Sequence, residues 1–406
     1  RYPIKKWAAT IAILGATFYL VISGAAVATQ RAWIMICLMF LAVLLDRPAL
    51  SIRNVMLAAT VILLWRPESL IGASFQMSFS AVIALIAFYE SEPVCRWTSR
   101  PRGAGIEALI SRAFAYILGI ALTSIVAGTA TGVIAAFHFN RIAIYGLAGN
   151  MAAMPLVGIV VMPMALVSLL LMPLGLDGPA LWAMGKGVDG MLAIAHEVAA
   201  WNGADRMVSA APLLALVVTV LGALWLTLWR ANWRYAGILP IVVGLGLWGS
   251  GPRPDILVDR DAALFALRGA DGHLVLTASR PSYTAGQWLR YEGDERTARD
   301  AARSEFMQCD GRGCAYREPG RPSIAFPETL GAVVEDCERS EIVIAAVSVP
   351  RQTRKECAAR LLLDYFFFWR NGATAINLDE DGQLHIVTAR QMRGARPWVQ
   401  RRPKNQ

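Results

Sequence analysis

The sequence predicts a polytopic α-helical membrane bundle followed by an α/β soluble domain. Hydrophobic residues make up 56% of the 406-residue chain and the mean hydropathy is +0.45, far more apolar than a soluble core requires. Residues 1–250 carry 16 Lys and Arg against 9 Asp and Glu, whereas residues 251–406 carry 23 against 21. We therefore expect a membrane domain at 1–250, a soluble extracytoplasmic domain at 251–389 and a basic tail at 390–406.

The membrane domain contains nine apolar runs that are candidates for crossing about 30 Å of hydrocarbon. Val55–Trp65 is short, and Leu181–Trp201 contains ionisable residues, so each is either a span or a re-entrant or interfacial helix. Those ionisable residues are Lys186, Asp189, His196 and Glu197. We expect about 7–9 membrane segments. The runs are Trp7–Ala28, Ala32–Leu45, Val55–Trp65, Ile71–Tyr89, Ala113–Phe137, Ile142–Met172, Leu181–Trp201, Pro212–Trp229 and Ala236–Gly249.

The positive charges predict the orientation of these segments, because Lys and Arg concentrate in cytoplasmic loops. If all nine runs cross, one set of alternate connections holds twelve Lys and Arg, and the other holds four. The poorer set is Arg31, Arg66, Arg141 and Arg206. The N-terminus of the chain is therefore expected in the cytoplasm and the soluble domain on the outer side. The chain begins at Arg1 and enters an apolar run at once, without a cleavable signal pattern, so we expect an N-terminally incomplete membrane domain.

Four cysteines of the soluble domain fit an extracytoplasmic location, where disulfides persist. Cys309 and Cys314 flank Asp310-Gly311-Arg312-Gly313 and would close a small hairpin loop. Cys337 and Cys357 would tie a strand edge to the following helix. The alternative is four unlinked thiols.

The soluble domain shows an α/β pattern. Alternating strands are expected in ILVDRDAALFAL and HLVLTA around Asp271-Gly272, in EIVIAAVSV, and in ATAINLDEDGQLHIV around Asp381-Gly382. Helical spacing is expected at Asp294–Phe306 and Arg354–Asp364.

The block Arg47–Ile86 has polar side chains at membrane depth that a lipid-facing hairpin would not need. Ser74, Gln76 and Ser78 follow the break at Arg66-Pro67 within a few residues. Polar groups in hydrocarbon are costly and usually face a partner helix or a cavity. The block therefore indicates a polar task inside the bilayer.

Several motifs of the membrane half occur in a recognisable order. They are Ser23-Gly24, TQRAWIM at Thr29–Met35, Asp46-Arg47-Pro48, Arg66-Pro67, GASFQMSF at Gly72–Phe79, and Asn150 with Pro155 in GLAGNMAAMPLVGIVVMP. Over about residues 7–250 these motifs resemble the competence domain of the ComEC family of DNA-uptake proteins. The resemblance implies a multi-pass bacterial inner (plasma) membrane channel for DNA internalization, which passes one strand of transforming DNA into the cytoplasm during natural transformation.

The resemblance also implies partners. These are single-stranded DNA, the lipid bilayer, a DNA receptor outside, and a cytoplasmic ATP-driven motor or single-stranded-DNA-binding proteins, with a homo-oligomer as a further option. The motor would be a separate protein, because the chain has no Gly-rich Lys-Ser/Thr phosphate loop. Family members carry an upstream OB-like domain and further spans, which this sequence lacks; that fits a fragment.

Many family members end in a metallo-β-lactamase-like domain with a His-x-His-x-Asp-His motif that binds two metal ions. This chain has four histidines, His138, His196, His273 and His385, and no two are neighbours. The soluble domain therefore resembles a degenerate lactamase-like fold, as in family members whose tail is like Arg396-Pro397-Trp398-Val399. We expect no metal, no cofactor, no catalytic residue and no nuclease activity.

A conduit for single-stranded DNA needs cations or oriented donors for phosphates. Candidate path residues are Gln30, Arg31, Arg66, Ser74, Gln76, Ser78, His138, Asn140, Arg141 and Asn150. Each also has a structural alternative. Arg31 and Arg66 would snorkel to the outer headgroups, and Gln76 with its serines would join helices. Asn140-Arg141 would mark the end of a span.

Two further segments have a structural role, a DNA-binding role, or both as interpretations. Asn150 would brace a helix broken at Pro155. The basic tail, with Arg390, Arg393, Arg396, Arg401, Arg402 and Lys404, would hold DNA, or would be solvated or lie on anionic headgroups.

Three function classes remain. The first is a DNA conduit, the second is another multi-pass transporter or a structural subunit, and the third is a membrane-anchored hydrolase. The last would need clustered His, Asp or Glu, which the sequence does not show. The motifs favour the conduit.

Overall fold

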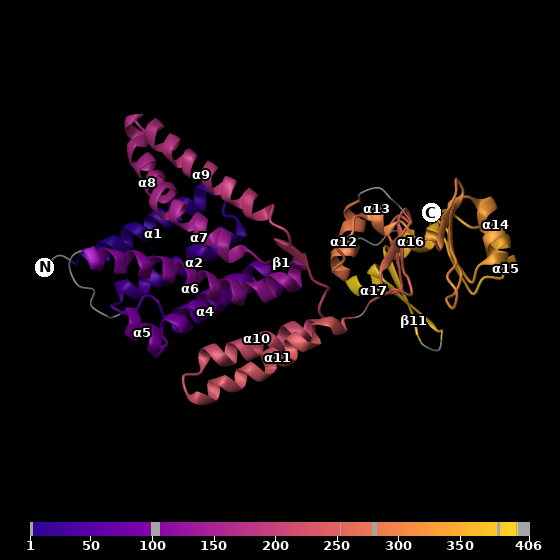
Figure 1. Ribbon diagram of the computed structural model, residues 1–406, viewed down its shortest axis with the longest axis horizontal. Coiled ribbons are helices and arrows are strands. Elements are labelled where there is room, and N and C mark those ends of the chain that lie inside the picture. Colours follow the sequence, from indigo (N-terminus) through magenta and orange to yellow (C-terminus); the bar gives the residue numbers. More distant parts are fainter. Residues whose placement is uncertain are drawn as a thin grey trace. The chain divides into compact units, whose positions relative to one another are not determined.

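The computed structural model describes residues 3–98, 106–251, 253–277, 282–379, 382–394 and 396. The chain forms two compact units, shown in Figure 1. Unit 1 comprises Arg1–Arg206 and Leu213–Leu247, and unit 2 comprises Met207–Pro212 and Trp248–Gln406. Several basic residues considered above lie outside the described residues, namely Arg1, Arg100, Arg102, Arg401, Arg402 and Lys404, as do Asp381 and Pro397-Trp398-Val399.

Unit 1 is built from helices and one two-stranded sheet. The strands are β1 (Arg141–Ala143) and β2 (Asp205–Met207). The helices, in chain order, are α1 (Ile4–Ile22), α2 (Val27–Leu44), α3 (Ile52–Trp65), η1 (Pro67–Ile71), α4 (Ala73–Tyr89), α5 (Glu92–Thr98), α6 (Ile106–Phe139), α7 (Gly146–Leu156), η2 (Val157–Val161), α8 (Met162–Leu171), η3 (Met172–Leu174), α9 (Gly178–Ala199), α10 (Leu213–Leu228), η4 (Asn232–Gly237) and α11 (Ile238–Gly246). The short helix η5 (Leu247–Ser250) begins at the last residue of unit 1, and its other residues belong to unit 2.

Fewer helices reach membrane length than the seven to nine segments expected. Within the described residues, four are long and apolar enough to cross: Ile4–Ile22, Val27–Leu44, Leu109–Phe139 and Gly146–Leu174. Three shorter apolar helices, α3, α4 and α10, have 14, 17 and 16 residues. At 1.5 Å per residue these extend only about 21 to 26 Å. The expected span Ala236–Gly249 is divided between η4, the nine-residue α11 and η5.

Local sequence sets where these helices begin and end. The first helix stops at Ile22, short of the expected Ala28, because Gly24 and Ala25 adopt positive φ angles of 69° and 50° that reverse the chain. The hydroxyl of Ser51 accepts a hydrogen bond from the Asn54 backbone N–H and caps α3. Pro67 then starts η1 where α3 ends.

The expected break at Pro155 is a change of helical pitch. Pro155 lies inside α7, and the chain continues through η2, which is a π-helix, into α8. Proline removes one backbone donor and crowds the preceding turn, and a π-turn absorbs that distortion without unwinding the helix. The residues from Gly146 to Leu174 therefore remain one apolar helical segment.

Two kinds of packing hold unit 1 together. Large apolar side chains of α2, α3 and α4, including Ile34, Ile62 and Phe79, form a buried cluster. Glycines bring α10 and α11 into backbone contact, since a Cβ atom on Gly222 would lie 2.9 Å from the backbone nitrogen of Ile241. Only hydrogen fits there, so this hairpin depends on its small residues.

Ion pairs define one end of the helical unit. Lys6, at the start of α1, lies 2.7 Å from Asp46, just after α2, and Arg230, after α10, lies 2.6 Å from Glu90, just after α4. We call this the basic end. The opposite end contains the starts of α2 and α4, the end of α6, and the β1–β2 ribbon.

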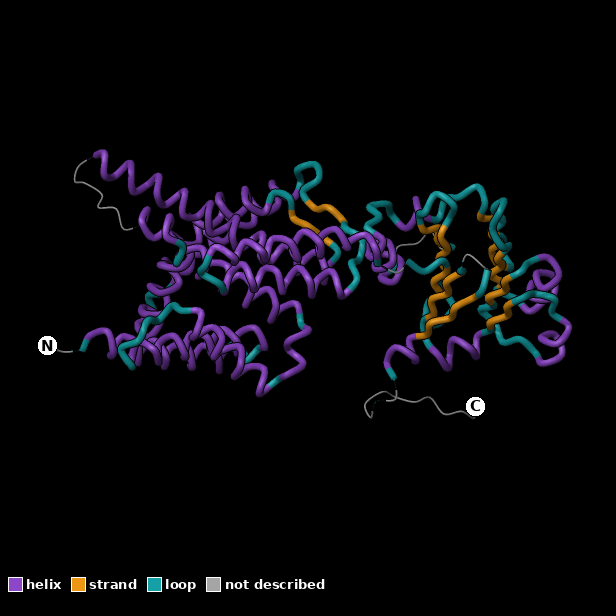
Figure 2. Tube along the Cα trace, turned by 90° about the horizontal axis from the view of Figure 1, so that it is seen from below, coloured by secondary structure: helices purple, strands orange, loops and turns teal. Residues whose placement is uncertain are grey.

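Unit 2 is a four-layer structure with two sheets inside and helices outside (Figure 2). The first sheet has the order β12-β11-β3-β4-β5 with antiparallel neighbours. The second has the order β10-β9-β8-β7-β6, in which β8, β9 and β10 are parallel and β6, β7 and β8 are antiparallel. The strands are β3 (Ile256–Val258), β4 (Phe265–Arg268), β5 (Leu274–Leu276), β6 (Met307–Cys309), β7 (Gly313–Tyr316), β8 (Ile324–Pro327), β9 (Ile342–Ile344), β10 (Leu361–Leu363), β11 (Thr374–Leu378) and β12 (Leu384–Thr388).

The facing sides of the sheets carry the main core, with Phe265 and Phe326 4.6 Å apart between ring centroids. Helices α12 (Tyr283–Glu292) and α13 (Ala298–Ala301) cover the outer face of the first sheet. Helix α14 (Leu330–Arg339) covers that of the second. The remaining helices are α15 (Arg351–Glu356), α16 (Tyr365–Asn371) and α17 (Ala389–Arg393).

Each segment expected to form strands does so, although ILVDRDAALFAL holds strand β3 and part of strand β4, with a turn between them. Both expected helices are wrong for most of their length. Asp294–Phe306 is a loop with one helical turn at α13, because Asp294 uses its side chain on the backbone N–H of Arg296. Arg354–Asp364 ends in strand β10, since Leu361–Leu363 pairs with β9.

Candidate functional site: a polar layer at one end of the helical unit

Helices α2, α4 and α6 bring four polar side chains together at the end opposite the basic end. Arg31 on α2 donates from Nη2 to Ser74 Oγ on α4. His138 Nε2 lies 3.0 Å from Gln76 Oε1, which joins α6 to α4. We call Arg31, Ser74, Gln76 and His138 the polar layer. Its position follows from sequence, because Ser74 and Gln76 occupy the first turn of α4, and His138 the last turn of α6.

The hydrogen bonds of Gln76 define the protonation pattern of the layer. Its amide nitrogen donates to the carbonyl oxygen of Leu70 at 2.9 Å, so its amide oxygen faces His138. The imidazole must then carry a proton on Nε2 to complete that bond. Gln76 thus connects η1, α4 and α6, as the helix-joining alternative expects.

Arg31 is the charged member of the layer and is only 7% exposed. Its Nε has no hydrogen-bond partner within the described part of the chain, and no carboxylate there forms an ion pair with it. The side-chain acceptor of this buried guanidinium is one neutral hydroxyl, so other N–H donors of Arg31 are available for a further acceptor. Carboxylate and phosphate oxygens both match the planar fork of a guanidinium. The layer is therefore able to hold an anion.

Three other candidates lie near the same end but outside the layer. Gln30 donates to the carbonyl oxygen of Ala25 at 2.7 Å and so stabilises the turn before α2. Arg66 is half-buried at the end of α3, where its backbone N–H bonds to Ile62. Ser78 is half-buried one turn further into α4.

The remaining candidates follow the layer in the chain. Asn140 adopts a positive φ of 54° and turns the chain from α6 into β1. Arg141 pairs with Asp205 of β2 at 2.8 Å, so its charge is neutralised within the ribbon. Asn150 is exposed on α7 and makes no side-chain hydrogen bond to the described residues, so the brace expected at Pro155 does not form there.

Sequence reasoning missed the ion pairs at the basic end. Asp46 and Glu90 were available as signals, since each is an acid immediately after an apolar run. Their partners Lys6 and Arg230 are 40 and 140 residues away in sequence, a distance that local patterns do not bridge.

Unit 2 places its cysteines in pairs, Cys309 with Cys314 and Cys337 with Cys357. The first pair joins opposite residues of the β6–β7 hairpin, and the second fastens α14 to the segment after α15.

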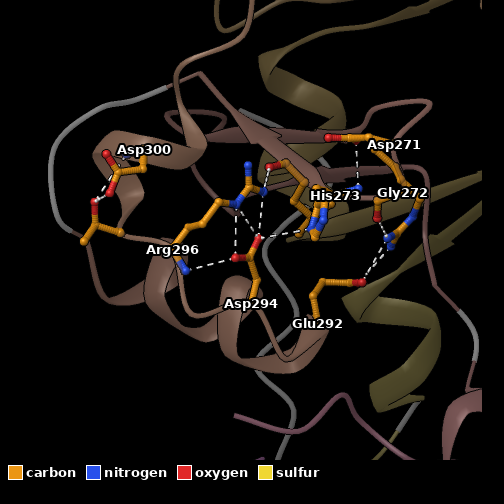
Figure 3. Close-up of polar contacts among 10 residues, drawn as sticks. Asp271, Gly272, His273, Glu292, Asp294, Arg296 and Asp300 are labelled. Atoms are coloured by element: carbon orange, nitrogen blue, oxygen red, sulfur yellow. Dashed lines mark hydrogen bonds and ion pairs between the residues drawn. The ribbon is translucent and has the colours of Figure 1, made fainter. Parts of the chain in front are cut away.

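A second polar cluster lies in unit 2 beside β5 and α12 (Figure 3). Arg296 Nη2 lies 2.7 Å from Asp294 Oδ2, and Arg296 Nε lies 2.9 Å from the same atom. Burial acts to raise the pKa of Asp294, but the hydrogen bonds from Arg296 outweigh it and hold that pKa below its ordinary value. The bond to Asp294 raises the pKa of Arg296.

The two buried carboxylates of this cluster, Asp294 and Glu292, both accept hydrogen bonds from arginines. Glu292 receives two hydrogen bonds from Arg268, at 2.8 and 2.9 Å, and His273 Nδ1 is 3.9 Å from Asp294 Oδ2. His385 lies elsewhere, 2.7 Å from Asp379. Among the described residues, no group of three or more His, Cys, Asp or Glu side chains is placed to hold a metal ion. The cluster is a structural network that joins α12 to the first sheet.

Comparison with known proteins identifies one family. A family model described as Competence protein matches residues 1–233, which is more than half of the chain and contains the whole polar layer. Neither the search of curated proteins nor that of solved structures gave a significant match.

Proposed function

Because this chain belongs to the competence protein family, we propose that its membrane half is an inner-membrane conduit that passes single-stranded DNA into the cytoplasm during natural transformation. The family indicates a role in DNA uptake, and the helices of membrane length indicate a membrane location. The observation that carries the proposal is the polar layer, in which a buried arginine with donors in reserve lies at the end of three packed helices.

In this proposal the strand meets the polar layer first. Each nucleotide carries one phosphate charge, and a charge-assisted hydrogen bond from a guanidinium contributes about 1.5–3 kcal/mol. Arg31 would receive the phosphate, while Gln76 and His138 offer neutral donors and acceptors that a moving strand exchanges without a large barrier. A conduit must bind weakly enough to release, and one buried cation beside neutral groups meets that need.

The orientation we propose places the basic end in the cytoplasm and the polar layer at the outer face of the inner membrane. Lys6 and Arg230 lie at the basic end, in agreement with the preference of Lys and Arg for cytoplasmic loops. Unit 2 would then be periplasmic. Its two disulfides support this, because oxidised cysteine pairs persist outside the cytoplasm.

For unit 2 we propose a degenerate metallo-β-lactamase-like domain without nuclease activity. The support is the layered arrangement of two sheets between helices, together with carboxylates that arginines already neutralise. Metal-dependent cleavage of DNA by the purified protein would contradict this proposal. The partners proposed are a DNA receptor outside and a separate cytoplasmic ATP-driven motor or single-stranded-DNA-binding proteins, with a homo-oligomer as a further option.

The conduit is tested in naturally transformable cells that carry the complete protein. The double variant Arg31→Ala/Gln76→Ala should accumulate labelled duplex DNA in the periplasm and yield far fewer transformants, because the strand loses its first donors. Gln76→Glu keeps an acceptor for His138 but adds a negative charge, so it should reduce transformants more than Gln76→Ala does.

The matched control is Ser80→Ala on the same helix. Ser80 donates only to the carbonyl oxygen of Met77 in its own helix, so its loss should leave transformation unchanged. Protein amounts in the membrane are measured by immunoblot for every variant. A double variant that is present at the normal level and transforms normally would refute the assignment of the polar layer to the DNA path.

A further inference from the structure

Helix α9 is packed along a helical segment of membrane length. A Cβ atom on Gly187 would lie 2.8 Å from Val161, and one on Gly190 would lie 3.2 Å from Leu156. Gly149 of α7 similarly approaches Val198, 3.9 Å away. These contacts run antiparallel from Gly149 to Val161 of the Gly146–Leu174 segment, which is long and apolar enough to cross a membrane. The 22 residues of α9 extend about 33 Å, so α9 is long enough to lie alongside most of that segment.

The side chains of α9 divide into three stripes, since residues three, four and seven apart share a face. The first stripe packs on η2 and its neighbours and consists of Ala180, Gly187, Ile194 and Val198. The second is exposed and apolar and consists of Leu181, Val188, Leu192 and Ala195. The third is exposed and polar and consists of Trp182, Lys186, Asp189, Ala193, His196 and Glu197.

The apolar exposed stripe suits lipid, but the polar stripe does not. Lys186 Nζ lies 3.3 Å from Asp189 Oδ2 near the middle of α9, and these side chains are 63% and 67% exposed. A charged side chain at the centre of a bilayer costs about 2.5–3.5 kcal/mol on insertion scales and more in simulations. Such residues face water-filled cavities or protein. Asp189 and Val188 are neighbours in sequence, so the boundary between lipid and a polar medium runs between them.

We propose that α9 lies in the membrane beside the Gly146–Leu174 segment and that its polar stripe borders a water-filled path that favours hydrated cations. The stripe contains one lysine and two carboxylates, Asp189 and Glu197, so its net charge is negative when His196 is neutral. It therefore repels phosphate and attracts cations. The path therefore serves small cations or protons, and it goes beyond the proposed DNA conduit, whose polar layer contains the cation Arg31. The small side chain of Ala193 leaves room for water one turn from Asp189.

The test is the reactivity of single cysteines in the full chain in native membrane vesicles. Cys37 and Cys95 are replaced by serine, and the other four cysteines are disulfide-bonded. Ala193→Cys on the polar stripe is compared with Val188→Cys on the apolar stripe. The probes are membrane-impermeant cationic and anionic methanethiosulfonates, which transfer a charged thioalkyl group to the thiolate and release methanesulfinate.

We expect Ala193→Cys to react at least tenfold faster than Val188→Cys. It should also prefer the cationic reagent, relative to the preference of a small free thiol, and Asp189→Asn should reduce that preference. Equal, slow reaction at both positions would overturn the proposal. So would crosslinking of Ala193→Cys to a second copy or to another protein, because protein would then cover the stripe. A preference for the anionic reagent would overturn the cation path. None of these readouts needs DNA, so failure here is distinct from failure of the conduit.

Discussion

Replacing Asp294 by Asn tests whether the buried ion pair of unit 2 holds α12 and the following loop to the first sheet. Asp294 has a side chain only 5% exposed and accepts three side-chain hydrogen bonds from Arg296, at 2.7, 2.9 and 3.1 Å. Asparagine keeps the shape and one acceptor but presents an amide N–H to the guanidinium. Two charge-assisted bonds are lost, and the charge of Arg296 is left without its partner.

The size of the effect follows from burial. Removing one partner of a fully buried pair costs about 3–5 kcal/mol. Arg296 is 34% exposed, so water satisfies part of the loss, and we expect about 2–3 kcal/mol. That range corresponds to a roughly 30- to 150-fold decrease in the folding equilibrium constant of unit 2.

Hydrogen exchange measured by mass spectrometry on the full chain in detergent provides the readout. The slowest amides of β4 and β5 should lose protection by that factor, because they exchange through opening of the unit. Amides of the α10–α11 hairpin in unit 1 serve as the internal reference. Glu295→Gln, at the exposed neighbouring carboxylate, is the matched control. Unchanged protection of β4 and β5 in Asp294→Asn would refute the reasoning.

The pH dependence gives the same pair a second test. The folded pKa of Asp294 is lowered below 3.8, so the pair contributes stability that is present above the unfolded pKa and is lost as pH falls through the folded one. The difference between wild type and Asp294→Asn should therefore be full at pH 7 and shrink below pH 3.8. A difference that is equally large at pH 2 would contradict the ionic origin of the effect.

Three further predictions concern packing, disulfides and a buried phenol. Gly244→Val should open the α10–α11 hairpin, because its Cβ would meet Thr219 Oγ1 and lie 2.8 Å from the carbonyl oxygen of Ala215; limited proteolysis should show it, and Gly246→Val, with open space around it, should resist like wild type. Cys337→Ser/Cys357→Ser should lower the unfolding free energy of unit 2 by about 2–4 kcal/mol, and reduction by dithiothreitol should destabilise wild type but not this variant at that site. Burial and the hydrogen bond to Glu318 raise the pKa of Tyr316 above 10. The phenol therefore contributes stability that is fully present below pH 10 and is lost as pH rises through the folded pKa. Between pH 10 and 12, Tyr316→Phe should lose less stability than the wild type in the same exchange experiment.

The strands that the sequence predicts are those with local signals. Ile256–Val258, Phe265–Arg268 and Leu274–Leu276 are apolar segments separated by turns at Ala262 and Gly272, both with positive φ. Strands β6, β7 and β8 escaped prediction although they are no shorter than β3, β5 and β9. The polar residues of the hairpin that joins β6 and β7 interrupt the apolar alternation there. Strand β10 escaped because Leu361–Leu363 is equally compatible with a helix, and only its pairing with β9 decides.

The candidate site, too, could be predicted from the sequence only in part. Ser74 and Gln76 stand out in sequence because polar groups are rare inside apolar runs. The contacts of Arg31 with Ser74 and of His138 with Gln76 span 43 and 62 residues of sequence. They depend on the parallel packing of α2 with α4 and the antiparallel packing of α4 with α6. The ionisable residues of α9 were visible too, but they left a span, a re-entrant helix and an interfacial helix as alternatives. The glycines at 187 and 190 fit α9 against Leu156 and Val161, in a segment that is long and apolar enough to span a membrane.

The proposed conduit would have to move a polyanion through unit 1, and the charges there bear on its energy. Transfer of one phosphate charge against a membrane potential that is negative inside costs about 2.3 kcal/mol per 100 mV, and this cost recurs for every nucleotide. Arg31 offsets it only locally, because a single buried cation binds a phosphate and must then release it. A cation that travels in the same direction would cancel the charge movement. The stripe of Asp189 and Glu197 on α9 has the sign for such a cation, and Arg31 has the sign for the strand. If both paths exist, dissipating the membrane potential should leave uptake by the wild type nearly unchanged and should speed uptake by Asp189→Asn, because only the variant would work against the potential. An equal effect on both would mean that the two paths are not coupled.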